Sequence, residues 1–172
     1  MTNDFNNILS VTSSLQKELE TIISPPDDGL APHSYQVLPN AITKGTRVYI
    51  ERVSQQINGC YENGWYDACS VMMRKLLETV IIEVFESKNI SQELKNNDGD
   101  FLFLKDLIDI TLKHTEFNLG RNVKKGLPKL KDVGDKAAHG RRYTTQRLYI
   151  DELKNEFRDT IQELLILAKL SN

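Results

Sequence analysis

The sequence predicts an all-α protein, an antiparallel up-down bundle of four to five helices with an extra N-terminal helix. Apolar residues recur at steps of three and four along most of the chain, which is the spacing of residues on one face of an α-helix. No segment of the sequence alternates apolar and polar residues as a half-buried β-strand would. Short polar links separate the periodic segments, as expected for helices that pack antiparallel.

The N-terminal part of the chain is expected to contain one helix and a linker. The helix is predicted over residues 1–23, because Asn3 or Asp4 can cap it and apolar residues follow at helical spacing. Residues 24–40 contain four of the five prolines, which cannot continue a helix, so they are predicted to form a proline-rich connector. The helical bundle itself is predicted over residues 41–170.

The next two predicted helices form the apolar centre of the bundle. The first begins between Ala41 and Thr46 and ends at Tyr61, before a tight turn at residues 62–64. Its inward residues are expected to be Val48, Tyr49, Val53, Ile57 and Cys60. The second spans residues 65–87 and is apolar over more than half of its circumference, so other helices must surround it.

The polar edge of the 65–87 helix carries Asp67, Arg74 and Glu78 in line. Arg74 and Glu78 are spaced to form an ordinary i,i+4 ion pair on the helix surface. A role in a binding site or an interface is the alternative for the same residues.

Three more segments complete the predicted bundle. A polar loop over residues 89–100 leads to a helix from Phe101 to about His114. The next helix begins near Asn118 and is expected to kink or break at Gly126 and Pro128. The last helix begins at Thr144, Thr145 or Asp151, and its inward residues are expected to be Leu148, Ile150, Leu153, Phe157, Ile161, Leu164, Leu165 and Ala168.

The helix before Gly140 has two distinct faces. One face carries apolar and small residues and the other a polar stripe: Leu127, Leu130, Val133, Gly134, Ala137 and Ala138 against Asp132, Asp135, Lys136 and His139. Gly140 is expected to end the helix in the left-handed conformation. His139 is expected to hydrogen-bond the last carbonyls of the helix, with Asp135 pairing to its other nitrogen, unless the polar stripe serves chemistry.

Charge is distributed unevenly along the chain. Residues 121–147 contain nine lysines and arginines but only two acidic residues, whereas the whole chain has a formal net charge of -2. A positive patch on an acidic protein attracts phosphates. The alternative is a solvated helix face that binds nothing.

Several classes of function are not expected from this sequence. Cys60 and Cys69 lack the C-x-x-C spacing and are predicted to be reduced thiols of a cytoplasmic protein. The chain has no export signal and no window of the ~18 apolar residues that a membrane span needs. Only three histidines are present, so no metal site is predicted, and no cofactor is expected because the common nucleotide and hydrolase motifs are absent.

Two passages resemble a known family. Cys60-Tyr61-x-x-Gly64-x-Tyr66-x-Ala68 leads to Arg74-x-x-Leu77-Glu78, and Gly134-Asp135-x-Ala137-Ala138-His139-Gly140 follows later. Together they resemble an uncharacterised bacterial helical domain that occurs alone or attached to restriction-endonuclease subunits, and that looks like a branch of the HEPN superfamily. The resemblance covers about residues 38–168. It implies a four-helix core, frequent homodimers, and roles in defence, toxin-antitoxin pairs or RNA handling.

The resemblance also implies what a catalytic member would need. Active HEPN proteins cut RNA without a metal, using a histidine as general acid or base and an arginine that precedes it with four to six residues between the two. Counting back from His139, the arginine positions hold Asp132, Val133 and Gly134, while Asp135 occupies the usual polar position. A replacement cation would have to come from Arg74, Lys131, Lys136, Arg141 or Arg142.

The sequence therefore predicts a non-catalytic helical module for dimerisation and interaction, in a bacterial defence, restriction or toxin-antitoxin context. Its polar basic groove around His139 is expected to bind RNA or a partner protein from the same locus. The expected binding residues are Arg74, Glu78, Lys131, Lys136, Arg141 and Arg142. The alternative is a metal-independent HEPN-type endoribonuclease with His139 and Asp135 as its catalytic residues. Small-ligand binding and a purely structural role in a defence complex are further alternatives.

Overall fold

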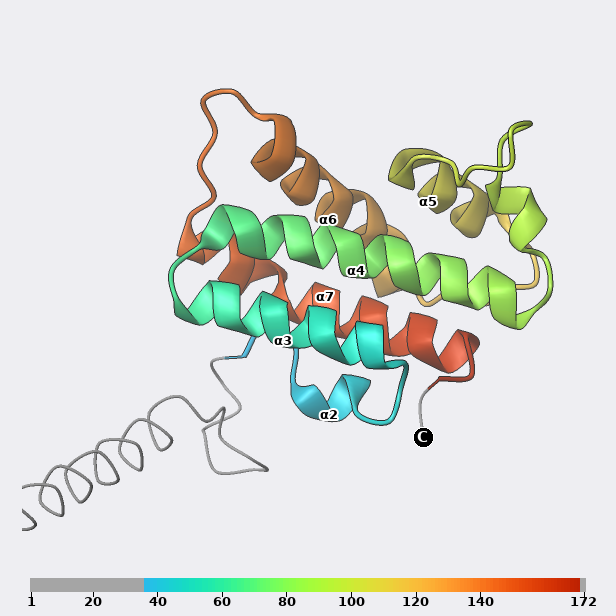
Figure 1. The fold of residues 1–172 in the computed structure, drawn as a ribbon, viewed down its shortest axis with the longest axis horizontal. Coiled ribbons are helices and arrows are strands. Elements are labelled where there is room, and N and C mark those ends of the chain that lie inside the picture. The colour runs from blue at the N-terminus through green and yellow to red at the C-terminus, as the bar shows by residue number, and fades with distance from the viewer. Residues whose placement is uncertain (1–35, 171–172) are drawn as a thin grey trace, which may run out of the picture. The chain divides into compact units, whose positions relative to one another are not determined.

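The computed structural model describes residues 36–170, and the predicted helix over 1–23 and most of the predicted connector lie outside this range. The described chain is helical, as predicted, and its only β-type pairing is an isolated bridge between Lys95 and Phe101. The helices in order are α2 (Asn40–Thr43), α3 (Val48–Glu62), α4 (Tyr66–Ser87), the 3₁₀-helix η1 (Ser91–Leu94), α5 (Leu104–Lys113), α6 (Arg121–His139) and α7 (Arg147–Leu167) (Figure 1).

Helix α4 is the centre of the bundle and packs against α3, α5, α6 and α7 (Figure 1). Its buried residues cover more than half of the helix circumference, in agreement with the apolar character of its sequence. They are Cys69, Ser70, Met73, Leu76, Leu77, Val80, Ile81, Glu83, Val84 and Phe85. The predicted tight turn before α4 is also confirmed, and Gly64 adopts a positive φ of 75° there.

The buried stripes of α3 and α7 differ from the prediction at their first turns. Val48 and Tyr49 in α3 and Leu148 in α7 were expected to point inward but are exposed. Ile50, which was not predicted to face inward, and Ile150, which was, are fully buried. The burial of Ile50 and Ile150 fixes the rotation of each helix about its own axis. Residues one or two positions earlier then lie 100–200° around the helix from the buried face.

The end of the predicted connector is packed into the bundle. The side chains of Val37 and Leu38 are fully buried. Asn58 of α3 accepts a hydrogen bond from the Leu38 N–H at 3.0 Å and donates one to the Leu38 carbonyl at 2.8 Å. Arg158 of α7 donates to the carbonyls of Gln36 and Val37. The bundle's packing therefore includes residues 36–38, which precede the predicted boundary at residue 41.

The polar loop predicted over residues 89–100 contains the short helix η1, whose Leu94 is fully buried. The following helix α5 begins at Leu104 and not at Phe101, which pairs with Lys95. The loop is thus anchored to the core by one apolar residue that its polar composition concealed.

Helix α6 continues through Gly126 and Pro128, so of the expected kink or break the break does not occur. A proline removes the hydrogen bond to the carbonyl four residues earlier, here that of Lys124. Lys124 and Pro128 both lie on the exposed side of α6, where water can reach that carbonyl. Leu127 and Leu130 remain buried on the opposite side and hold the helix to the bundle.

Both cysteines are free thiols, and Cys69 lies fully buried in α4. Burial raises the pKa of the Cys69 thiol to about 12, so this group stays protonated near neutral pH. No helix within residues 36–170 is both long enough and apolar enough to cross a membrane.

Candidate functional site

The candidate site is organised by a close approach of α4 and α6. A Cβ atom added at Gly134 would lie 2.6 Å from the Cβ of Arg74 and 3.0 Å from its Cδ. The aliphatic part of Arg74 therefore lies directly against the backbone of α6. Glycine is required here because any side chain at position 134 would overlap Arg74.

Four of the predicted site residues meet at this approach in one ion-pair network. The Arg74 Nε donates to Asp135 Oδ1 at 2.7 Å, and the Lys131 Nζ donates to Asp135 Oδ2 at 2.6 Å. The expected pair between Arg74 and Glu78 is present, but its N–O distance of 3.6 Å is longer. The dominant partner of Arg74 is thus on α6, 61 residues away in sequence.

The network shifts the pKa values of Asp135 and Lys131. Partial burial acts to raise the pKa of Asp135, but the hydrogen bonds from Lys131 and Arg74 outweigh it and lower the pKa below its ordinary value of 3.8. The hydrogen bond to Asp135 raises the pKa of Lys131 above 10.5. Asp135 is therefore an ionised acceptor near neutral pH, which does not suit a general acid.

His139 stands apart from this network. It is the last residue of α6 and is exposed, and no hydrogen bond or ion pair joins its imidazole to another residue of the described chain. Each carboxylate oxygen of Asp135 already accepts a hydrogen bond from Arg74 or Lys131. The expected pair between Asp135 and His139 is therefore not formed. Ala138, predicted to face a neighbouring helix, is also exposed at this end of α6.

Six cations line the outer side of α6 and the turn after it, and we call this surface the α6 basic face. All six are exposed and form no ion pair with a described residue: Arg121, Lys124, Lys125, Lys136, Arg141 and Arg142. The other basic residues of this region have acidic partners, as in the Lys129–Glu156 pair at 2.6 Å. From Arg121 to His139 the face extends about 27 Å along the helix axis.

The turn after α6 differs from the prediction in its backbone. Gly140 has a φ of -73° and is not left-handed. Glycine is nevertheless needed, because a Cβ there would overlap the Lys136 carbonyl and lie 2.8 Å from the Cβ of Tyr143. The Tyr143 N–H donates to the Gly140 carbonyl at 3.1 Å, which closes a turn with Arg141 and Arg142 at its tip.

Two clusters near this turn were not found from the sequence. Tyr149 of α7 stacks on Tyr143 with ring centroids 6.4 Å apart. In the second cluster, the Tyr61 hydroxyl donates to Asp151 and accepts from Arg147 at 3.0 Å, while Lys154 lies 3.9 Å from the Tyr61 ring centroid. The hydrogen bonds of this second cluster join residues that are 86 and 90 positions apart in sequence, so no local sequence pattern predicts them.

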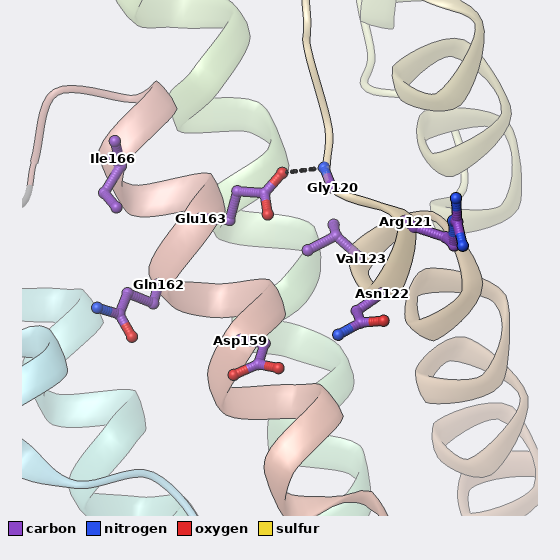
Figure 2. A pocket seen from close by; sticks show the side chains of 8 residues that line it. All are labelled: Gly120, Arg121, Asn122, Val123, Asp159, Gln162, Glu163 and Ile166. Atoms are coloured by element: carbon purple, nitrogen blue, oxygen red, sulfur yellow. Dashed lines mark hydrogen bonds between the residues drawn. The ribbon is translucent and has the colours of Figure 1, made fainter.

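A separate hollow of about 440 Å³ lies where the start of α6 faces α7 (Figure 2). Its lining residues are Gly120, Arg121, Asn122, Val123, Asp159, Gln162, Glu163 and Ile166. The Gly120 N–H, which could otherwise bind an anion, already donates to Glu163 Oε1 at 2.5 Å. Apart from Arg121, this hollow shares no residue with the α6 basic face or the ion-pair network.

Within the described residues no group of three or more His, Cys, Asp or Glu side chains could hold a metal ion.

Comparison with protein-family models, curated proteins and solved structures finds nothing similar to this chain. The site is therefore interpreted from its own geometry, which defines a helical bundle with an internal ion-pair network and an outer basic face.

The close approach at Gly134 predicts a destabilising substitution. Gly134→Ala should lower the free energy of unfolding by about 2 kcal/mol, because the new Cβ overlaps Arg74 and forces the two helices apart. Gly59→Ala is the matched control: position 59 in α3 has nothing within 4 Å of an added Cβ, so it should gain about 0.5 kcal/mol. Urea unfolding of both variants measures the difference, and equal effects would contradict the close approach.

The ion-pair network predicts a pH-dependent effect of Asp135→Asn. At about pH 7 this variant should lose on the order of 1 kcal/mol, because Arg74 and Lys131 lose their charged acceptor. The folded-state pKa of Asp135 lies below 3.8, so its contribution is present above pH 3.8 and is lost as the pH falls through the folded-state pKa. Urea unfolding should therefore show the two proteins converging in strong acid. The control is Asp132→Asn, at an exposed position where the carboxylate lies 3.6 Å from Lys131. A stability difference between the wild type and Asp135→Asn that persists in acid would contradict the assignment.

Proposed function

We propose that this protein is a non-catalytic helical interaction module that binds RNA through phosphate contacts along the α6 basic face. The observation that supports this proposal best is the set of six exposed cations without acidic partners on one side of α6 and the turn after it. Cations already held by carboxylates must first break those pairs to bind a phosphate, whereas these six need not. Their spread over about 27 Å suits an extended polyanion better than a single small anion.

The position of the network relative to the face also supports this division of roles. Asp135 is the acidic residue of the 121–147 region that lies closest to the bundle interior, and Arg74 and Lys131 neutralise it. Asp132 is the other acidic residue there, and Lys131 is 3.6 Å from it. Repulsion between these carboxylates and a bound phosphate backbone is thereby reduced.

A non-catalytic role fits the surroundings of His139. A general acid or base is normally oriented by a hydrogen-bonded partner, and Asp135 is already occupied by two cations. The positions from which HEPN enzymes present their arginine hold Asp132, Val133 and Gly134. The arrangement therefore supports phosphate binding better than phosphate cleavage.

The wider context of the proposal comes from the resemblance of the two sequence passages. We include in it a HEPN-like up-down bundle that works as a homodimer in bacterial defence, restriction or toxin-antitoxin systems. Both passages of the resemblance meet in space, since Arg74 of the first binds Asp135 of the second. This contact supports treating the two passages as parts of one structural unit.

One observation favours the alternative, a metal-independent endoribonuclease. Arg74 reaches Asp135, one helical turn before His139, so an arginine from α4 lies near the histidine although positions 132–134 hold none. Incubation of cellular RNA with the purified protein in EDTA tests this alternative. For a binding module we expect no cleavage; cleavage that disappears in His139→Ala but persists in Lys136→Ala would establish the ribonuclease instead.

The α6 basic face predicts how RNA binding depends on salt. The double variant Arg141→Gln/Arg142→Gln should bind RNA more weakly. Its plot of log K against log salt concentration should also be less steep, by about 1.4 for a single strand, because two phosphate contacts are lost. The control is Lys105→Gln/Lys113→Gln, which removes the same charge from exposed positions of α5. Fluorescence anisotropy over a salt series measures both slopes. Equal slopes for the two variants would show that only net charge matters and would contradict the assigned face.

A further inference from the structure

The turn after α6 brings two arginines and two tyrosines to the same end of the bundle. Arg141 and Arg142 project from the tip of the turn, and Tyr143 at its end stacks on Tyr149 of α7 with their planes 18° apart. We infer that this surface holds an unpaired base of single-stranded RNA on the Tyr149 ring while the arginines bind the adjoining phosphates. This inference rests on the proposed function and adds to it the kind of RNA that is bound.

The surface is held in place by contacts on both sides of the turn. On one side, Gly140 allows Tyr143 to pack against the end of α6 at a distance that no other residue would permit. On the other side, the Thr145 N–H donates to Asp67 Oδ1 of α4 at 2.7 Å. The turn is therefore fixed to two helices, so little order has to be created when a ligand binds.

The exposure of the tyrosine pair is what points to a base. Tyr143 is half-buried, and Tyr149 retains 43% of its surface exposed although its ring packs on Tyr143. An exposed aromatic ring beside unpaired arginines is the combination with which proteins bind single-stranded nucleic acids, since every base offers a flat π-face. Phosphate binding alone would require the arginines but not the ring.

The same geometry selects against other partners. In double-stranded RNA the base faces are stacked on one another, so the Tyr149 ring could not reach them. An acidic polypeptide would pair with Arg141 and Arg142 but has no flat group in each residue to stack on the ring. The ring and the arginines are used together only by a single strand with accessible bases.

The test compares the binding of four probes to the whole chain. They are a short oligouridylate, an abasic strand of equal length, a duplex RNA of equal length, and polyglutamate. The wild-type protein should bind oligouridylate about tenfold more tightly than the abasic strand, because stacking is available only to the first. Tyr149→Ala should remove this preference while leaving the affinity for the abasic strand unchanged, and Tyr149→Phe should retain it because the ring is kept.

Tyr49→Ala is the matched control. Tyr49 is a tyrosine of nearly equal exposure, 45%, in the first turn of α3. It lies about 18 Å along that helix from Tyr61, which contacts the start of α7. Its removal should not alter the preference for oligouridylate.

The outcomes distinguish a failure of the inference alone from a failure of the proposed function. Equal binding of oligouridylate and the abasic strand, unchanged in Tyr149→Ala, would overturn base stacking but leave phosphate binding intact. No binding of any strand would overturn both. Tighter binding of polyglutamate than of oligouridylate would show that the face recognises an acidic protein and would overturn both as well.

Discussion

The contact between Arg74 and the backbone at Gly134 determines how α6 lies on the central helix of the bundle. With no side chain at position 134, the aliphatic part of Arg74 fills the space between the helices. The guanidinium then continues along α6 to Asp135. The packing contact is at Gly134 and the ion pair is at the next residue, Asp135. Together they fix the distance of α6 from α4 and the rotation of α6 about its own axis. The buried Leu127 and Leu130 stabilise the same orientation further along α6.

This orientation divides the polar stripe of α6 into two parts with different physical roles. The inner part consists of Lys131 and Asp135, which are satisfied by each other and by Arg74. The outer part is exposed. It consists of Lys136 and His139, whose side chains have no partner within the described chain, and of Asp132, which lies 3.6 Å from Lys131. A network with its charges paired contributes to structure, whereas unpaired exposed charge is available to a ligand. The formal net charge of -2 for the chain does not reveal this separation.

The link between α6 and α7 adds a second kind of chemistry to the basic face. Gly140 lets the chain turn back so that Tyr143 meets Tyr149, and the Asp67 side chain holds the end of the link on α4. The two tyrosines and the arginines of the turn, which form no clear pattern in the sequence, thus become neighbours. A surface of this composition is distinct from the hollow at the opposite end of α6, where carboxylates of α7 face the helix start and the Gly120 N–H is already bonded (Figure 2).

Local features of the fold were predictable because they depend on residues close in sequence. The helical class, the central position of α4 and the Gly64 turn follow from periodicity and from glycine's conformational freedom. The first turns of α3 and α7 were mispredicted because apolar residues there fall off the stripe set by Ile50 and Ile150. The break expected at Pro128 did not occur because the freed carbonyl of Lys124 lies on the exposed side of α6.

By itself, the sequence determined that the described chain is a helical bundle and that its cations gather in one region. It also marked Arg74, Lys131, Asp135 and His139 as polar residues on helix surfaces. Only the tertiary structure decided that Asp135 pairs with Arg74 and Lys131 and leaves His139 alone, and that Tyr149 joins Tyr143. The physical reason is range: helix periodicity reports which side of a helix a residue occupies, whereas the partner it meets there depends on how distant helices pack.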